Sequence, residues 1–260
     1  MSSNGTAISF GGVSLQTANI LTQDIEHAGA SAKRAQTYSL SHANASRIPF
    51  VEYPNKPITI SGTIIGSSIS DCDSQIDTFN AALLTQNGNL DIGYISGTRR
   101  YIATATNINV SRPNGLAYAN FSVTFTCTQA FGQDVTATTA VSATGRTSNT
   151  YSDSYTFLGT GPFQLPVFTV TFTANAGSGN QSVSVGNAST GQVIMVTRVW
   201  SSTDVLIIDC NQNTVTVNGI ATDFSGAFPM FPPGAQTLYY LDTFTSRTFN
   251  YNVAYNVLYL

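Results

Sequence analysis

Seven short runs of alternating apolar and polar residues follow one another between residues 165 and 260, and they constrain the fold more than any other feature. Successive side chains of a strand point to opposite faces, so each run predicts a strand with one buried face. Turn residues such as Asn211-Gln212-Asn213 separate the runs. Short strands at regular intervals are typical of a β-sandwich, which we expect over residues 146–260. The runs are LPVFTVTFTA, QSVSVGNA, GQVIMVTRVWSS, DVLIIDC, TVTVNGI, QTLYYLDTF and TFNYNVAYNVLYL.

The first half of the chain contains one segment with a helical pattern, SISDCDSQIDTFNAALLTQNGN. We expect a helix over about residues 71–87, with Ser70 or Asp71 as its N-cap. Gly88 would end it in a left-handed conformation. Three apolar side chains form the face that we expect to be buried: Ile76, Phe79 and Leu83.

Strand patterns surround this helix. PITISGTIIG precedes it, and LDIGYIS, RRYIATATNINV and YANFSVTFTCTQ follow it. The sequence therefore predicts an N-terminal domain over residues 1–132, in which a β-sheet or sandwich carries one packed helix. The next residues, 133–145, are rich in Thr and Ala and have weak periodicity, so we expect a connector there that contains one strand at most. The whole chain is predicted to be mainly β.

The segment Asp24–Phe50 has little apolar alternation and contains both histidines, Lys33, Arg34 and Arg47. It is too long for a simple hairpin turn. Segments of this length without a clear pattern are usually functional or disordered in compact domains.

Charged residues make up 9% of the chain, and the formal net charge is −3. No basic run exceeds Lys33-Arg34 or Arg99-Arg100, so we expect no specific nucleic-acid binding, which needs clustered cations. No apolar run approaches a membrane span, and the start MSSNGTAISF has no signal-peptide pattern. Three widely spaced cysteines predict small buried side chains in a reducing cytoplasm and no disulfide framework or zinc site: Cys72, Cys127 and Cys210.

The sequence offers no convincing catalytic or metal site. Asp71, Asp73 and Asp77 are better explained as helix-start acids, because the glycine and the bidentate glutamate of a calcium loop are missing. We interpret His27 and His42 as solvated loop residues, since no cysteine or second histidine stands at metal-ligand spacing. A triad, a metal site or a glycosidase carboxylate pair assembled in three dimensions stays an alternative. We predict a protein that is not an enzyme and has no catalytic residue, cofactor or metal.

The segment NGIATDFSGAFPMFPPGAQTL, residues 218–238, combines three glycines, three prolines and three phenylalanines with a single charge. Proline disfavours helix at the residue before it, and Pro233-Gly234 suits the centre of a type II turn. We interpret the segment as a stiff crossover between two sheets, with Phe228 and Phe231 among the rings buried at one end of the sandwich. Sugar binding by these rings is the alternative. For the single tryptophan, Trp200, core packing is favoured over stacking on a sugar.

Several motifs, in order along the chain, are similar to those of one family. IIDCNQNTVTVNG, DFSGAFPMFPPGAQTL and FNYNVAYNVLYL resemble the C-terminal domain of the distal tail proteins of long-tailed bacteriophages. ISFGGVSL, ITISGTI, IDTFNAALL, LDIGY, GTRRYIATA and FSVTFTCTQAF resemble the N-terminal domain of that family. The chain departs from the family at Ala130-Phe131, where other members often have a proline before the phenylalanine. The resemblance spans nearly the whole chain.

The resemblance implies an N-terminal ring-forming domain and a C-terminal galectin-like β-sandwich. It implies a homohexameric ring in the distal virion tail, assembled in the cytoplasm of the bacterial host. Such a ring joins the tail-tube protein to tip, baseplate and receptor-binding proteins, and DNA passes through it. The Asp24–Phe50 segment takes the place of an arm that contacts neighbouring subunits in the family. The alternatives are a carbohydrate-binding receptor module, with Trp200 or the phenylalanines as platform, and a tail-tube subunit, which would not need the second sandwich.

Overall fold

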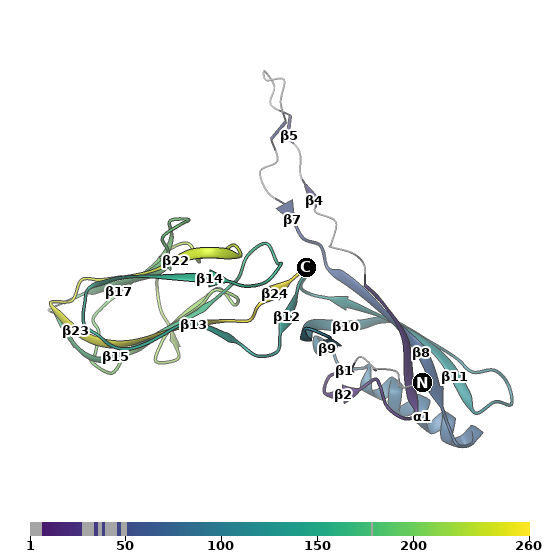
Figure 1. Ribbon diagram of the computed structural model, residues 1–260. Coiled ribbons are helices and arrows are strands. Elements are labelled where there is room, and N and C mark those ends of the chain that lie inside the picture. Colours follow the sequence, from purple (N-terminus) through teal and green to yellow (C-terminus); the bar gives the residue numbers. More distant parts are fainter. Residues whose placement is uncertain (1–6, 28–33, 36–37, 40–45, 48–50, 178) are drawn as a thin grey trace. The chain divides into compact units, whose positions relative to one another are not determined.

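The computed structural model describes residues 7–27, 34–35, 38–39, 46–47, 51–177 and 179–260 (Figure 1). The chain forms two compact units, Met1–Val135 and Thr136–Tyr259, and each has a hydrophobic core of its own. Among the described residues there is one helix, and the remaining regular structure is β. The predicted mainly β fold with a single packed helix is confirmed.

One antiparallel sheet organises the first unit, with strand order β2-β1-β9-β10-β11-β8-β3 and β12 beside β10. Its strands have one buried face: in β8 every second residue from Lys56 to Ile64 is buried. This alternation is what the sequence pattern predicts for a sheet covered on one side. The strands are β1 (Ile8–Phe10), β2 (Val13–Ser14), β3 (Ile20–His27), β8 (Lys56–Ile65), β9 (Gly88–Tyr94), β10 (Gly97–Ser111), β11 (Tyr118–Cys127) and β12 (Gly132–Asp134).

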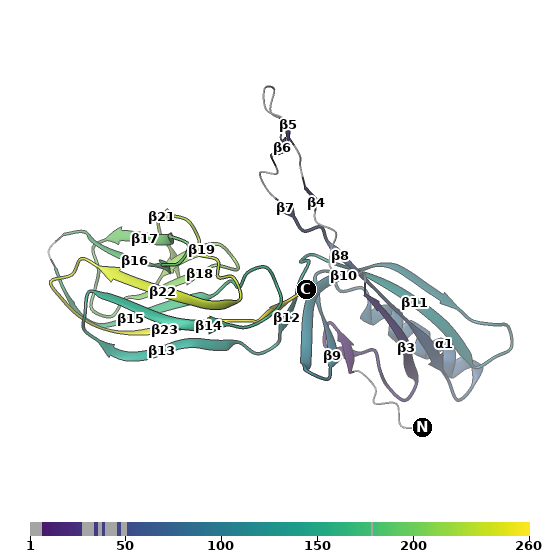
Figure 2. The ribbon, with the colours of Figure 1, turned by 45° about the horizontal axis from the view of Figure 1, so that its top comes forward.

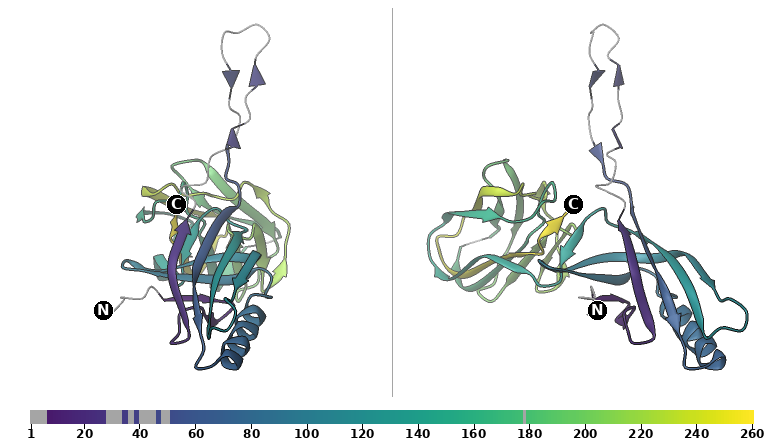
Figure 3. Two further views of the ribbon diagram at one scale, coloured as in Figure 1. Left: turned by 90° about the vertical axis from the view of Figure 1, so that its right-hand side faces the viewer. Right: turned by 45° about the vertical axis from the view of Figure 1, so that its right-hand side comes forward.

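Helix α1 (Ile69–Ala82) packs on one face of this sheet, against β8 and β11 (Figure 3). Its N-cap is Ser68. We expected Ser70 or Asp71 in this role, and that prediction is wrong. The Ser68 hydroxyl accepts a hydrogen bond from the Asp71 amide at 3.1 Å. The Asp71 carboxylate accepts hydrogen bonds from the backbone and the side chain of Ser67, and these bonds lower its pKa. Asp71 thus stabilises the helix start from within the first turn.

The helix ends at Ala82, earlier than the predicted end at about residue 87, because the apolar face stops at Leu83. Gly88 is not the left-handed stop. Asn87 takes the left-handed conformation, with φ of 50°, and Gly88 begins β9. A Cβ at Gly88 would lie 3.0 Å from ring atoms of Phe10, so close packing explains this glycine.

The predicted long segment 24–50 is entered by β3, which pairs with β8 as an antiparallel hairpin. Two further antiparallel pairings continue this hairpin: Arg34 pairs with Glu52, and Tyr38 pairs with Arg47. The sequence analysis expected a segment too long for a simple hairpin turn. The described pairs extend a hairpin ladder into it, which the weak apolar alternation of the sequence does not reveal. The short strands are β4 (Arg34–Ala35), β5 (Tyr38–Ser39), β6 (Ser46–Arg47) and β7 (Val51–Glu52).

The second unit is a β-sandwich of two antiparallel sheets (Figure 2). One has the strand order β13-β23-β15-β18-β19-β20, and the other has the order β14-β22-β16-β17-β21. All seven runs predicted from alternation contain strands of this sandwich. The strands are β13 (Thr138–Arg146), β14 (Thr150–Phe157), β15 (Val167–Ala176), β16 (Gln181–Asn187), β17 (Gln192–Arg198), β18 (Val205–Asp209), β19 (Thr214–Val217), β20 (Ile220–Ala221), β21 (Ser225–Gly226), β22 (Gly234–Asp242) and β23 (Ser246–Tyr255). The last strand of the chain, β24 (Leu258–Tyr259), lies outside both sheets of the sandwich.

Strand β13 occupies most of the region where we expected a connector, residues 133–145. β13 and β14 are edge strands of the two sheets, and much of each is exposed. β13 is the one strand that the predicted connector allowed. An edge strand needs less apolar alternation, which is why the Thr- and Ser-rich sequence indicates it only weakly. Arg146 of β13 and Asp153 of β14 join the two edges through paired hydrogen bonds of 2.7 Å.

Candidate functional site

The segment 218–238 crosses from one sheet of the sandwich to the other, as predicted. β20 is the last strand of the six-stranded sheet, and β21 is the last strand of the five-stranded sheet. The crossing therefore lies between these two edge strands, at residues 222–224. Gly234, the first residue of β22, has the left-handed φ that the predicted Pro233-Gly234 turn requires, at 105°.

Phe231 anchors the crossover segment in the core and is fully buried. Its ring stacks on that of Phe157, with centroids 4.6 Å apart, and lies 6.1 Å from Phe168. Its backbone exchanges two hydrogen bonds with Gln164: the Phe231 amide donates at 3.1 Å, and the Gln164 amide donates at 2.7 Å. Phe231 is thus a packed element of the sandwich, as the crossover interpretation expects.

The other two phenylalanines of the segment are less buried. Phe228 packs partly buried against the core, whereas Phe224 is 42% exposed. Their rings contact each other edge to face, with centroids 5.2 Å apart. The prediction that the phenylalanines of this segment are buried is therefore wrong for Phe224. The crossing runs over the surface of the sandwich before the chain turns inward.

Polar side chains from other strands also hold the segment. The buried Asn187 amide donates to the Met230 carbonyl at 3.0 Å, and the Met230 amide donates to the Gln192 side-chain oxygen at 3.0 Å. The fully buried Gln164 accepts a hydrogen bond from the Leu258 amide at 2.8 Å. Nothing in the sequence pattern singles out these residues, since a polar residue in a strand is normally expected on the solvent face. These contacts make the segment a scaffold element.

Two glycines of the segment allow a matched stability test. Both have left-handed φ values, but a Cβ at Gly234 would meet nothing within 4 Å, whereas a Cβ at Gly226 would lie 2.0 Å from the Val193 carbonyl oxygen. We expect Gly234→Ala to cost about 1 kcal/mol through backbone strain alone. Gly226→Ala should cost about 2–3 kcal/mol because a steric clash adds to the strain. Urea unfolding measures both, and equal losses would contradict the assignment of the clash.

Trp200 is a core residue, as favoured from the sequence. It is 8% exposed, and its ring packs edge to face on Phe172 and Phe244. The indole Nε1–H donates to the Gln181 carbonyl at 2.8 Å. Both the ring and its donor are engaged, so Trp200 offers no open platform for a sugar.

The acidic and histidine candidates do not assemble into a site within the described part of the chain. Asp73 pairs with Arg112 at 3.2 Å, and Asp77 is exposed on α1. The side chain of His27 and all of His42 lie outside the described residues. No group of three or more potential metal ligands occurs among the side chains that the structure describes. No helix in this part is long and apolar enough to cross a membrane.

All three cysteines are free and buried, as predicted. Burial raises the pKa of the Cys127 thiol to about 11, so this side chain stays protonated and unreactive at neutral pH. Lys56 stands opposite Cys127 in the sheet and is 4% exposed, with its ammonium group 5.7 Å from the centre of the Tyr101 ring. Burial lowers the pKa of Lys56. These groups belong to the core of the first unit.

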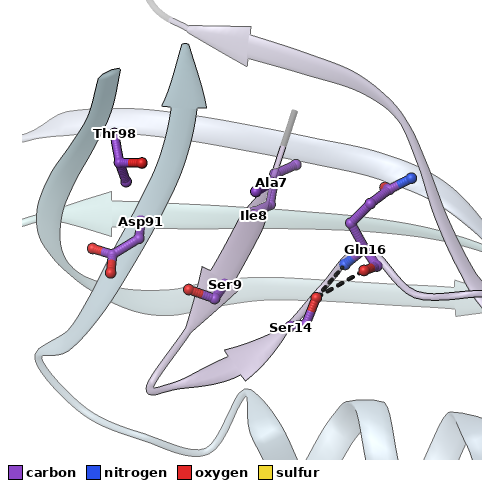
Figure 4. A pocket seen from close by; sticks show the side chains of 7 residues that line it. All are labelled: Ala7, Ile8, Ser9, Ser14, Gln16, Asp91 and Thr98. Carbon is purple, nitrogen blue, oxygen red and sulfur yellow. Dashed lines mark hydrogen bonds between the residues drawn. The ribbon is translucent and has the colours of Figure 1, made fainter. Parts of the chain in front are cut away.

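A hollow of about 430 Å³ lies over β1, β2 and β9 of the first unit (Figure 4). Asp91 lines it, but both of its carboxylate oxygens accept hydrogen bonds from Arg100 at 2.8 Å, and this pairing raises the pKa of the guanidinium. The Ser14 hydroxyl is bonded to the backbone of Gln16. The side chains of Asp91 and Ser14 are therefore already bonded to neighbouring residues of the chain. The lining residues are Ala7, Ile8, Ser9, Ser14, Gln16, Asp91 and Thr98.

Comparison with known proteins finds a family match for most of the second unit and structures of similar fold for both units. Residues 160–257 match the family of the siphovirus-type tail component, C-terminal domain. No curated protein sequence matches the chain. The crystal structure of SPP1 Dit, a paradigm of the hub adsorption apparatus in phages that infect Gram-positive bacteria, is similar with a TM-score of 0.69 and 13% identity, over 99% of this chain and 100% of that chain. The activated baseplate of phage P2 with calcium contains a chain that is similar with a TM-score of 0.52 and 8% identity, over 97% of each.

At these identities the structural likeness concerns the fold, and it extends over both units of the chain. The match to the family covers most of the second unit, including the crossover segment with its phenylalanines and prolines. The part of the chain that matches the siphovirus-type tail component, C-terminal domain, is thus residues 160–257, within the second unit.

Proposed function

We propose that the protein is a hub of a phage tail: a ring that joins the distal end of the tail tube to the tip or baseplate. The observation that carries the proposal is the family match of residues 160–257 together with a fold shared with SPP1 Dit over both units. SPP1 Dit belongs to a hub adsorption apparatus, and the P2 chain belongs to a baseplate. In this proposal the protein has a structural and not an enzymatic role, and it is located in the virion tail.

The two alternative functions have less support. A carbohydrate-binding module would need an accessible aromatic platform, but Trp200 and Phe231 are buried. Phe224 is exposed, yet phenylalanine lacks the polar group that tyrosine and tryptophan bring to such sites. A tail-tube subunit would not need the second sandwich, which makes up nearly half of this chain. The hub accounts for both units.

The mass of the purified full-length protein tests this proposal. Six copies of a 27.5 kDa chain form a ring of about 165 kDa, whereas a simple lectin domain need not associate. Mass photometry gives the copy number, and negative-stain electron microscopy shows whether the particle is a closed ring with a central opening. A monomer at micromolar concentration, or an open filament, would count against the hub.

Deleting residues 28–45 is expected to abolish the ring. The segment contains one partner of each of the pairs Arg34–Glu52 and Tyr38–Arg47, which continue the β3–β8 hairpin, and such an extension can contact a neighbouring subunit. Losing that contact surface should leave monomers or irregular oligomers in mass photometry. The fluorescence of Trp200 serves as the control, because this residue reports on the second unit and should be unchanged. Intact rings of the deleted protein would refute the role of the segment.

A further inference from the structure

An asparagine that precedes a glycine can lose its side-chain amide, because glycine has no side chain to hinder attack by its own backbone nitrogen. The sequence contains four such pairs: Asn4-Gly5, Asn87-Gly88, Asn114-Gly115 and Asn218-Gly219. The first lies outside the described residues. In each of the other three the asparagine stands in a turn. The fold gives these three pairs different surroundings.

The loss of the amide is an intramolecular reaction. The glycine nitrogen, once its proton has passed to hydroxide, bonds to the side-chain carbonyl carbon (Cγ) of the asparagine, and the Cγ–Nδ2 bond breaks to release ammonia. Water then opens the cyclic imide at either of its carbonyl groups and leaves aspartate or isoaspartate. The net change converts an amide and water into a carboxylic acid and ammonia. Its rate depends on whether the glycine nitrogen can approach Cγ.

Hydrogen bonds hold the Asn218 side chain away from this approach. Asn218 and Gly219 form the two-residue turn between β19 and β20, with left-handed φ values of 52° and 78°. The Asn218 side-chain oxygen accepts a hydrogen bond from the Val205 amide at 2.9 Å, and its side-chain nitrogen donates to the Asp204 carboxylate at 2.8 Å. Loss of the amide would remove a donor from the buried Asp204.

Packing restrains the pair Asn87-Gly88. Gly88 is buried at the start of β9, where it pairs with Ala103 of β10. The Asn87 amide donates to the Thr104 hydroxyl at 3.0 Å. Ring atoms of Phe10 lie 3.0 Å from the position of a Cβ at Gly88. The peptide group between residues 87 and 88 therefore has little room to rotate toward the asparagine side chain.

The pair Asn114-Gly115 has no such restraint. It lies in the loop that joins β10 to β11, and both residues are exposed (Figure 2). Within the described part of the chain, neither the Asn114 side chain nor the Gly115 amide forms a hydrogen bond. The turn is closed by the Leu116 amide, which donates to the Pro113 carbonyl at 3.3 Å. A Cβ at Gly115 would meet nothing within 4 Å, so the backbone has space to move.

We propose that Asn114 is a site of spontaneous deamidation, at which the Gly115 nitrogen displaces ammonia from the side chain of the folded protein. The same dipeptide is restrained at Asn87 and Asn218, so the fold selects Asn114. This inference does not depend on the proposed function. In the proposed virion tail a subunit is not replaced after assembly, so modified copies would accumulate with the age of the particle.

Deamidation changes the end of the β10–β11 hairpin in charge and in shape. The new carboxylate stands two residues from Arg112, whose guanidinium pairs with Asp73 of α1 at 3.2 Å. It therefore adds a second acid close to the cation that links this hairpin to the helix. Isoaspartate also adds a methylene group to the backbone of the turn that Pro113 and Leu116 close.

The test follows the three described Asn-Gly pairs in the purified full-length protein. The folded wild type is incubated in warm, mildly alkaline buffer made with heavy-oxygen water, which marks each side chain that is converted during the incubation. Digestion at acidic pH stops the reaction, and mass spectrometry of the peptides gives the rate at each pair. We expect Asn114 to react roughly tenfold faster than Asn87 and Asn218, or more. A rate at Asn114 no higher than the other two would overturn the proposal.

Gly115→Ala is the matched variant. The added methyl group hinders the approach of the nitrogen and has space in the folded loop, so the rate at Asn114 should fall roughly tenfold while the rates at Asn87 and Asn218 stay unchanged. In concentrated urea, the three pairs of the wild type should react at similar rates, because the fold no longer distinguishes them. An unchanged rate in Gly115→Ala, or a preference for Asn114 that persists in urea, would refute the assignment.

Discussion

Replacing Phe231 by alanine is expected to lower the free energy of unfolding of the second unit by about 3–5 kcal/mol. The side chain is fully buried, and its ring is stacked on Phe157. The substitution removes this contact and leaves a cavity that the neighbouring rings cannot fill, since the Gln164 backbone holds residue 231 in place. Urea unfolding of the full-length chain measures the loss. Trp200 is the only tryptophan and lies in the same core, so its fluorescence follows this unit alone.

The other two phenylalanines of the segment are graded controls. Phe228→Ala should cost less than Phe231→Ala, because the Phe228 ring is partly exposed in the structure. If the Phe228 ring were fully buried, its removal would lower the free energy of unfolding as much as Phe231→Ala does. Phe224 is 42% exposed, and its removal should change stability by no more than about 0.5 kcal/mol. The same loss for all three variants would contradict the packing described for the segment.

Replacing Asp242 by alanine is expected to cost about 3–5 kcal/mol, because it breaks a buried ion pair and leaves the partner charge uncompensated. Asp242 is 2% exposed. Its carboxylate accepts hydrogen bonds from the Tyr240 hydroxyl at 2.8 Å, the Phe244 amide at 2.9 Å and the Arg247 guanidinium at 3.0 Å. Arg247 also donates to the Phe244 carbonyl, so one carboxylate organises the turn between β22 and β23. Urea unfolding followed by Trp200 fluorescence measures the effect.

Two further variants serve as controls for the effect of Asp242→Ala. Asp242→Asn keeps the shape and part of the hydrogen bonding, and should lose less than Asp242→Ala. Asp223→Ala removes an exposed acid of the same unit and should be within about 0.5 kcal/mol of the wild type. A small effect of Asp242→Ala, close to that of Asp223→Ala, would mean that the buried network does not stabilise the turn.

Alternation predicted the strands of both units well, because one face of each strand is buried and the apolar residues have to recur at every second position. β8 and the seven runs of the sandwich are examples. The crossover segment was also predictable, since proline and glycine restrict the backbone directly. The galectin-like relationship of the sandwich stays a prediction.

Features that depend on contacts distant in sequence were not predictable. The edge strands β13 and β14 bury too little surface to alternate strongly. The roles of Gln164 and Asn187 depend on backbone groups more than forty residues away. The pairing of Thr63 with Asn120 becomes visible only with the register of β8 and β11, because the sequence alone does not give that register.

The two ends of the second unit lie side by side, since Thr138 at the start of β13 pairs with Tyr255 at the end of β23. When the first and last residues of a domain are neighbours, another domain can take its place, because the replacement only has to connect to the rest of the chain at that one position. Its core is also separate from that of the first unit. Replacing this sandwich, or extending it with a further domain, would therefore leave the core of the first unit unchanged.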